Sequence, residues 1–191
     1  MYHHDYLYKS ILIPEIRRYT YVMALKKILT YPEPVLRKKA KRITIFDDAL
    51  KQLAADMGET MYNAPGVGLA ANQIGVLKQI VVVDISKDEK EKEFIALVNP
   101  VISEGEGCVA GEEGCLSVRE YEAKVERFQK IHVAAQDLDG EPISFDAEDR
   151  FARIIQHEVD HLQGTLFIDH LSTLKKNLYK RKLKKILKAG E

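Results

Sequence analysis

Residues 147–164 read AEDRFARIIQHEVDHLQG, and this stretch decides the fold. Gly164 stands where a glycine commonly ends a helix, and the apolar side chains before it recur at helical spacing: Phe151, Ile154, Ile155, Val159 and Leu162. The predicted helix, 147–163, contains the pattern H-E-x-x-H, in which His157 and His161 are four residues apart. Residues four apart share one helical face, so both imidazoles can bind a single metal ion.

Glu158 follows His157 and lies about 100° further round the helix, so it can reach a water at the metal without occupying a coordination position. That position suits a general base in hydrolysis. The alternative is an ordinary helix with a solvated polar face. The flanking apolar residues instead indicate a mostly buried helix, where two histidines and two acids are costly without partners. We therefore favour a metal site.

A catalytic site of this type needs a third protein ligand and an open position. The usual downstream positions fail, because Phe167 stands where a histidine would be needed and His170 comes three residues too late. The one glutamate after Glu158 is Glu191, at the end of the chain. The third ligand must therefore come from upstream, where the candidates are Cys108, Cys115 and His132. A thiolate is the stronger ligand, but spacing does not decide between the cysteines, which we place in a glycine-rich loop over 105–114.

Helices and strands are expected on both sides of this loop. Asp47 or Asp48 begins a helix that Pro65-Gly66 ends, and a basic amphipathic helix runs over 171–187. The β-rich runs between them are 79–85, 94–102, 130–136 and, after the turn Asp139-Gly140, 143–145. The order predicts an α+β fold in which antiparallel β-sheets surround the central metal-binding helix and a helix ends the chain.

Composition supports one globular domain, since 46% of the 191 residues are hydrophobic and 30% are charged. No apolar run approaches the roughly 20 residues of a membrane helix, and two cysteines cannot form a disulfide framework. The net charge of zero conceals an asymmetry: from Ser172 onward eight Lys/Arg face one acid, whereas the first 171 residues hold 21 basic and 28 acidic side chains. We therefore expect the basic C-terminal end to bind a different partner from the rest of the chain.

The segment Gly66-x-Gly68-x-x-Ala71 imitates a dinucleotide-binding fingerprint. A true fingerprint follows a strand and opens a helix, whereas this one follows a predicted helix that ends at Pro65. We expect no nucleotide cofactor, only a loop that glycine allows close to another group.

Three segments together resemble the signature motifs of the peptide deformylase family, whose members remove the formyl group from N-formylmethionine on nascent chains. They are Gly66-Val67-Gly68-Leu69-Ala70-Ala71-Asn72-Gln73, Glu113-Gly114-Cys115-Leu116-Ser117 and Gln156-His157-Glu158-Val159-Asp160-His161. The resemblance covers about 23–171. It divides the chain into an N-terminal extension or upstream start at 1–22, a catalytic domain at 23–171 and a basic amphipathic helix at 172–191.

The resemblance also implies roles for residues. Metal ligands would be Cys115, His157 and His161, and Cys108 would be structural. A metal-bound hydroxide would attack the formyl carbon while Glu158 takes the water's proton and passes it to the leaving amine. The side chain of Gln73 and the backbone N–H of Leu116 would stabilise the oxyanion. The substrate-binding residues would be Val67, Gly68 and Ile154.

Ligand type does not identify the ion, but the family often uses ferrous iron, so we expect Fe(II), with Zn, Ni or Co as substitutes. The expected partners are N-formylmethionyl peptides and, through the basic helix, ribosomal RNA; we expect no membrane association and a cytoplasmic location. Two alternatives are a zinc-dependent peptidase, which the missing downstream ligand disfavours, and an inactive ribosome- or RNA-binding homologue.

Overall fold

The computed structural model describes residues 24–189 except 87 and 89–91, so the predicted extension at 1–22 lies outside the described residues. The elements in chain order are η1 (Pro34–Arg37), α1 (Asp48–Asn63), β1 (Gly68–Ala70), η2 (Ala71–Ile74), β2 (Ile80–Asp84), β3 (Phe94–Glu106), β4 (Val109–Cys115), β5 (Val118–Arg127), β6 (Lys130–Gln136), β7 (Pro142–Glu148), α2 (Asp149–Leu162), η3 (Phe167–His170) and α3 (Thr173–Ala189). The predicted α+β class is confirmed.

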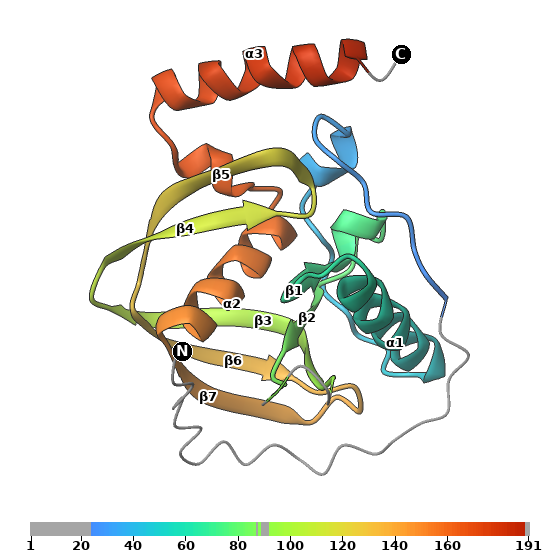
Figure 1. Ribbon diagram of the computed structural model, residues 1–191. Coiled ribbons are helices and arrows are strands. Elements are labelled where there is room, and N and C mark those ends of the chain that lie inside the picture. The colour runs from blue at the N-terminus through green and yellow to red at the C-terminus, as the bar shows by residue number, and fades with distance from the viewer. Residues whose placement is uncertain (1–23, 87, 89–91, 190–191) are drawn as a thin grey trace.

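Two antiparallel sheets enclose the helix α2. The larger has the order β1-β2-β3-β6-β7, and the smaller consists of β4 and β5. Figure 1 shows α2 between them, with the larger sheet on one side and the β4–β5 hairpin on the other. The predicted arrangement of antiparallel strands around a central helix is therefore also confirmed.

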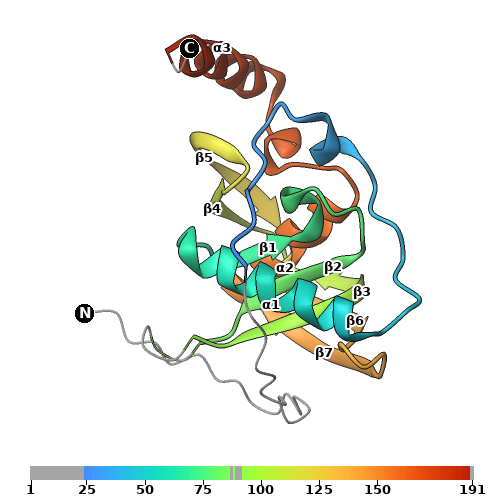
Figure 2. The same cartoon turned by 90° about the vertical axis from the view of Figure 1, so that its right-hand side faces the viewer.

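The larger sheet is covered on both faces around β2, as the alternation of side chains along this strand shows. Val81 and Val83 pack in one core cluster with Ile155 of α2, whereas Ile80 and Val82 pack in another with α1. Because successive strand residues point to opposite faces, β2 has buried apolar residues at its first four positions, 80–83. Figure 2 shows α1 running along its own side of this sheet, away from α2.

The helix α1 begins and ends where the sequence predicts. The Asp47 carboxylate accepts a hydrogen bond from the N–H of Leu50 at 3.0 Å, which satisfies a donor that the helix leaves free. The start of α2 was predicted two residues too early, because Ala147 and Glu148 still belong to β7 and pair with β6. At the other end Gly164 adopts a φ of +77°, and a side chain there would meet the Arg37 carbonyl at 2.5 Å.

The expected loop over 105–114 is wrong. β3 continues to Glu106, β4 begins at Val109, and β4 pairs with β5 from Val109↔Arg127 to Cys115↔Val118. The glycines suggested a loop, but Gly111 lies inside the strand, where a side chain would overlap the guanidinium of Arg153.

The last helix, α3, lies at the end of the molecule next to β5 (Figure 1). Tyr179 and Leu183 are buried against β5 and η3 in the third core cluster, whereas Leu174 and Leu178 are 69% and 52% exposed. The predicted apolar stripe is thus only partly buried. No helix among the described residues combines the length and apolarity needed to cross a bilayer.

Candidate metal centre

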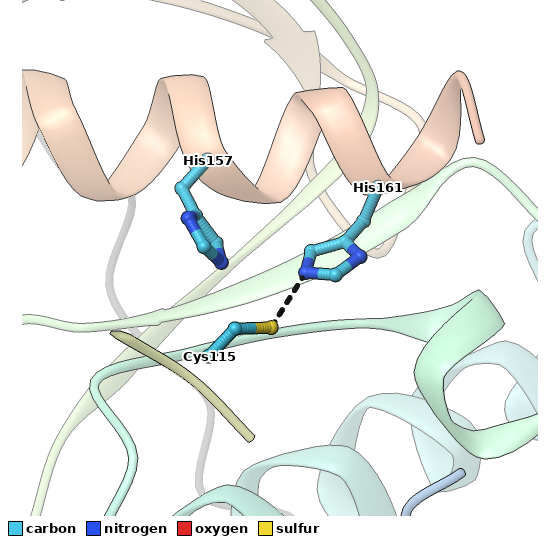
Figure 3. Close-up of side chains that lie close together, drawn as sticks. All are labelled: Cys115, His157 and His161. Carbon is cyan, nitrogen blue, oxygen red and sulfur yellow. Dashed lines mark hydrogen bonds between the residues drawn. The ribbon is translucent and has the colours of Figure 1, made fainter. Parts of the chain in front are cut away.

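The sulfur and imidazole donors of Cys115, His157 and His161 converge between β4 and α2. Their ligand atoms all lie within 4.8 Å of one another, and Cys115 Sγ is 3.1 Å from His161 Nε2. Figure 3 shows both imidazoles descending from α2 toward the sulfur. A thiolate with two imidazoles suits Zn²⁺ and related transition metals, and three protein ligands leave a position open.

The structure distinguishes among the three upstream candidates for the remaining ligand. Cys108 is exposed. His132 lies on the outer surface of the larger sheet, where its Nδ1 is 2.7 Å from an Asp146 carboxylate oxygen. Only Cys115 of the three lies beside His157 and His161, because it ends β4 where that strand faces α2.

Glu158 is buried next to this group, with 4% of its surface exposed. Burial raises the pKa of its carboxyl group to about 7, and its Oε2 has no hydrogen-bond partner among the described residues. A general base needs a pKa near the working pH and a free oxygen directed at its substrate. Gly68 of β1 passes so close that a side chain there would overlap this carboxylate.

Gln73 is held in place on η2 with its amide toward the sulfur. Its Oε1 accepts from the Ala70 N–H at 2.8 Å, and its Nε2 donates to Ser117 Oγ at 3.1 Å and to Cys115 Sγ at 3.6 Å. The orientation of the amide is therefore fixed, and its N–H groups lie beside the ligand atoms of the metal centre. Leu116 lines the cavity directly after Cys115.

Sequence reasoning missed a buried ionic network behind His157. Glu113 of β4 accepts from His157 Nδ1 at 2.9 Å, which leaves Nε2 free to bind a metal. Arg127 donates to both carboxylate oxygens of Glu113, at 2.9 and 3.1 Å, and also to Asp160 at 2.6 Å. Arg153 adds a further bond to Glu113 at 2.9 Å. The signal for Glu113 was its place in the second motif, but nothing in the sequence linked it to the two arginines.

This network keeps Glu113 ionised inside the protein. Burial alone would raise the pKa of its carboxyl group, but hydrogen bonds from His157 and Arg127 and the Arg127 charge outweigh burial and lower it to about 2. An ionised Glu113 accepts the Nδ1 proton of His157, and so determines which ring nitrogen faces the centre.

A cavity of about 640 Å³ opens in front of the donors. Val67, Gly68 and Ile154 line it together with Gln73, Leu116 and Glu158, so the structure brings the predicted substrate-binding residues to the same cavity as the predicted catalytic ones. Val67 is 36% exposed, which places it at the mouth. This volume lies within the range of about 300–1,000 Å³ that is typical of small-molecule sites.

Comparison with known proteins gives one consistent result. The family model described as polypeptide deformylase matches residues 25–177. The chain is 56% identical over 164 residues to a peptide deformylase of Desulfotalea psychrophila, covering 85% of this chain and 97% of that protein. It is 46% identical over 169 residues to one of Acidobacterium capsulatum, covering 88% of this chain and 99% of that protein.

Comparison with solved structures also finds peptide deformylases. A crystal structure of a peptide deformylase from Legionella pneumophila superposes with a TM-score of 0.81 at 46% identity, covering 87% of this chain and 98% of that one. One from Thermotoga maritima superposes with a TM-score of 0.74 at 41% identity, covering 78% of this chain and 99% of that one.

Proposed function

This chain belongs to the polypeptide deformylase family, and on that premise we propose that it hydrolyses the formyl group from the N-formylmethionine of nascent polypeptides and releases formate. The observation that carries the proposal is the group Cys115, His157 and His161 beside a buried glutamate at the base of a cavity. We also propose a cytoplasmic location, because the proposed substrates are nascent chains.

The three donors fit a divalent metal ion by type and by spacing. When bound there, such an ion lowers the pKa of a coordinated water and polarises the formyl carbonyl. We propose Fe(II) as the native ion, with Zn, Ni or Co as substitutes. Native iron predicts that activity decays in air and that the nickel form is stable; equal, air-stable activity of the zinc form would contradict it.

The chain's own residues would move the proton and hold the developing charge. Glu158, with its pKa near 7, accepts a proton from the attacking water and transfers it to the leaving amine. The side-chain amide of Gln73 and the backbone N–H of Leu116 donate to the oxyanion, each worth roughly 2.7 to 4 kcal/mol when preorganised. Because both hydrogen-bond donors are uncharged, they do not compete with the three ligands for the metal ion.

Substrate recognition is assigned to three residues of the cavity. Val67 and Ile154 would contact the methionine side chain, and Gly68 would let the peptide backbone run along β1. All three lie within the part of the chain, 23–171, that we assign as the catalytic domain.

Formate release from a formyl-Met tripeptide tests the assignment. Protein purified without oxygen is assayed beside Glu158→Ala, and the metal content of both samples is measured. Activity in the wild type, with metal but no activity in the variant, supports both the reaction and the role of Glu158. A metal-loaded wild type that releases no formate overturns the proposal.

The basic helix at 172–191 is proposed to bind ribosomal RNA, which would bring the site to emerging chains. Its lysines are mostly exposed on α3, and phosphate contacts of this type weaken steeply with salt. Replacing Lys184, Lys185 and Lys188 together with Glu keeps the buried face of α3. If this variant still sediments with ribosomes at low salt as the wild type does, the docking proposal is wrong.

A further inference from the structure

The helix α3 touches one wall of the cavity. The ring of Tyr179 is 1% exposed and stacks on Tyr121 of β5, with their centroids 4.6 Å apart. One turn along the same face, the Lys182 ammonium donates to the backbone carbonyl of Glu120 and lies 3.9 Å from its carboxylate. Two side chains of α3 therefore hold two consecutive residues of β5.

These two residues of β5 line the cavity. Glu120, Tyr121 and Glu122 all lie on its surface, a few residues after the metal-centre residue Cys115. Glu120 has a φ of +50°, in the left-handed region that non-glycine residues seldom occupy unless their surroundings hold them there. The bond from Lys182 to the Glu120 carbonyl is a contact of that kind.

Most of the reacting groups are held by contacts outside α3, whereas Cys115 packs against the same core cluster as Tyr179. Glu158, His157 and His161 belong to α2, and the Glu113–Arg127 ion pair fixes His157 from within the β4–β5 hairpin. Tyr121 also has a second aromatic neighbour, Phe167, with the ring centroids 6.2 Å apart, and this contact does not involve Tyr179. Loss of the α3 contacts therefore loosens the wall more than the metal centre.

We propose that Tyr179 and Lys182 are positioning residues for peptide binding, which act by holding the Glu120–Glu122 wall of the cavity. This inference rests on the proposed function. Without the two side chains the wall relaxes toward ordinary backbone geometry, and a formyl peptide loses preorganised contacts on binding. KM rises while kcat stays close to that of the wild type.

Kinetics on a formyl-Met tripeptide test the proposal. Lys182→Ala should raise KM roughly threefold, since the contact is partly exposed. Tyr179→Ala should raise it roughly tenfold, since a buried ring contact is lost. Lys182→Arg and Tyr179→Phe should each restore KM, and Lys180→Ala, an exposed lysine on the same helix, should match the wild type. Lys182→Ala, which changes a half-exposed side chain, decides the case if Tyr179→Ala fails to fold.

Hydrogen exchange gives a readout that does not depend on activity. The amides of 119–123 should exchange faster in Lys182→Ala than in the wild type or in Lys180→Ala, with no change in α2. The positioning role is overturned if Lys182→Ala has the same KM and kcat as the wild type, or if only its kcat falls. Unchanged hydrogen exchange at 119–123 in this variant overturns it as well. Absence of formate release by the wild type instead overturns the proposed function.

Discussion

Substitution of Gly68 by alanine should displace the carboxylate of Glu158, the proposed general base. A Cβ at Gly68 would lie 2.8 Å from Cδ of Glu158 and closer still to Oε1, whereas ordinary contact begins at 3.4 Å. Glu158 is buried at the wall of the cavity, so its carboxylate can yield only by moving away from its present position toward that space. The carboxylate must move by 0.6 Å at Cδ and by on the order of 1 Å at Oε1, and a misplacement of that size can reduce the rate about 100-fold. The overlap should also cost about 1–3 kcal/mol of folding free energy.

The assay is kcat for formate release at equal metal content, with urea denaturation run on the same samples. Gly105→Ala serves as the control, because its Cβ would overlap the Phe128 ring, which is half exposed between β5 and β6 and can swing away. A Gly68→Ala protein that keeps its metal and the full kcat would refute the reasoning. A rise in KM alone would show that the substitution blocks the peptide rather than moving Glu158.

Three further predictions concern Glu113 and Asp47. Glu113→Gln removes the charge that fixes His157, so metal affinity should fall about 10- to 100-fold in a chelator competition; unchanged affinity would contradict the positioning of His157. Because folding lowers the pKa of Glu113 from 4.5 to about 2, its stabilisation is complete above about pH 4.5 and is lost as the pH falls toward 2. Urea denaturation between these values should show a steeper loss in the wild type than in Glu113→Gln, and equal slopes would refute this linkage. Asp47→Ala removes the cap of α1 and should cost about 0.5–2 kcal/mol, seen as a lower Tm by circular dichroism; an unchanged Tm would show that the cap contributes nothing.

The sequence was sufficient to predict those elements in which the spacing of apolar residues and the chemistry of the side chains indicate the same structure. The helix α2 was predicted to within two residues at its start, because its apolar spacing, its histidine pair and Gly164 all point to the same helix. The strand β2 has a continuous run of apolar residues and β6 has alternating ones, so both could be predicted from the sequence. Residue spacing narrowed the third ligand to the upstream residues but did not choose Cys115, which was named only by the resemblance to the family.

The β4–β5 hairpin could not be predicted by the same means. Its sequence is rich in glycine and glutamate, and its strand character comes from pairing with a partner strand and from Arg153 filling the space above Gly111. The Glu113–Arg127 pair is likewise a tertiary feature, since the two residues meet only when the hairpin has formed. Propensity cannot report contacts that depend on the folded neighbours.

The donors of the metal centre come from two parts of the fold that are distant along the chain, the end of the small hairpin and the middle of the central helix. An ion bound there acts as a crosslink between them, and a crosslink that forms only in the folded state shifts the folding equilibrium by mass action. At a free ion concentration about 100 times its Kd the gain is about 2.7 kcal/mol. The abundance of this protein in a cell would then follow the supply of metal, since chains made during scarcity unfold more often and are degraded sooner.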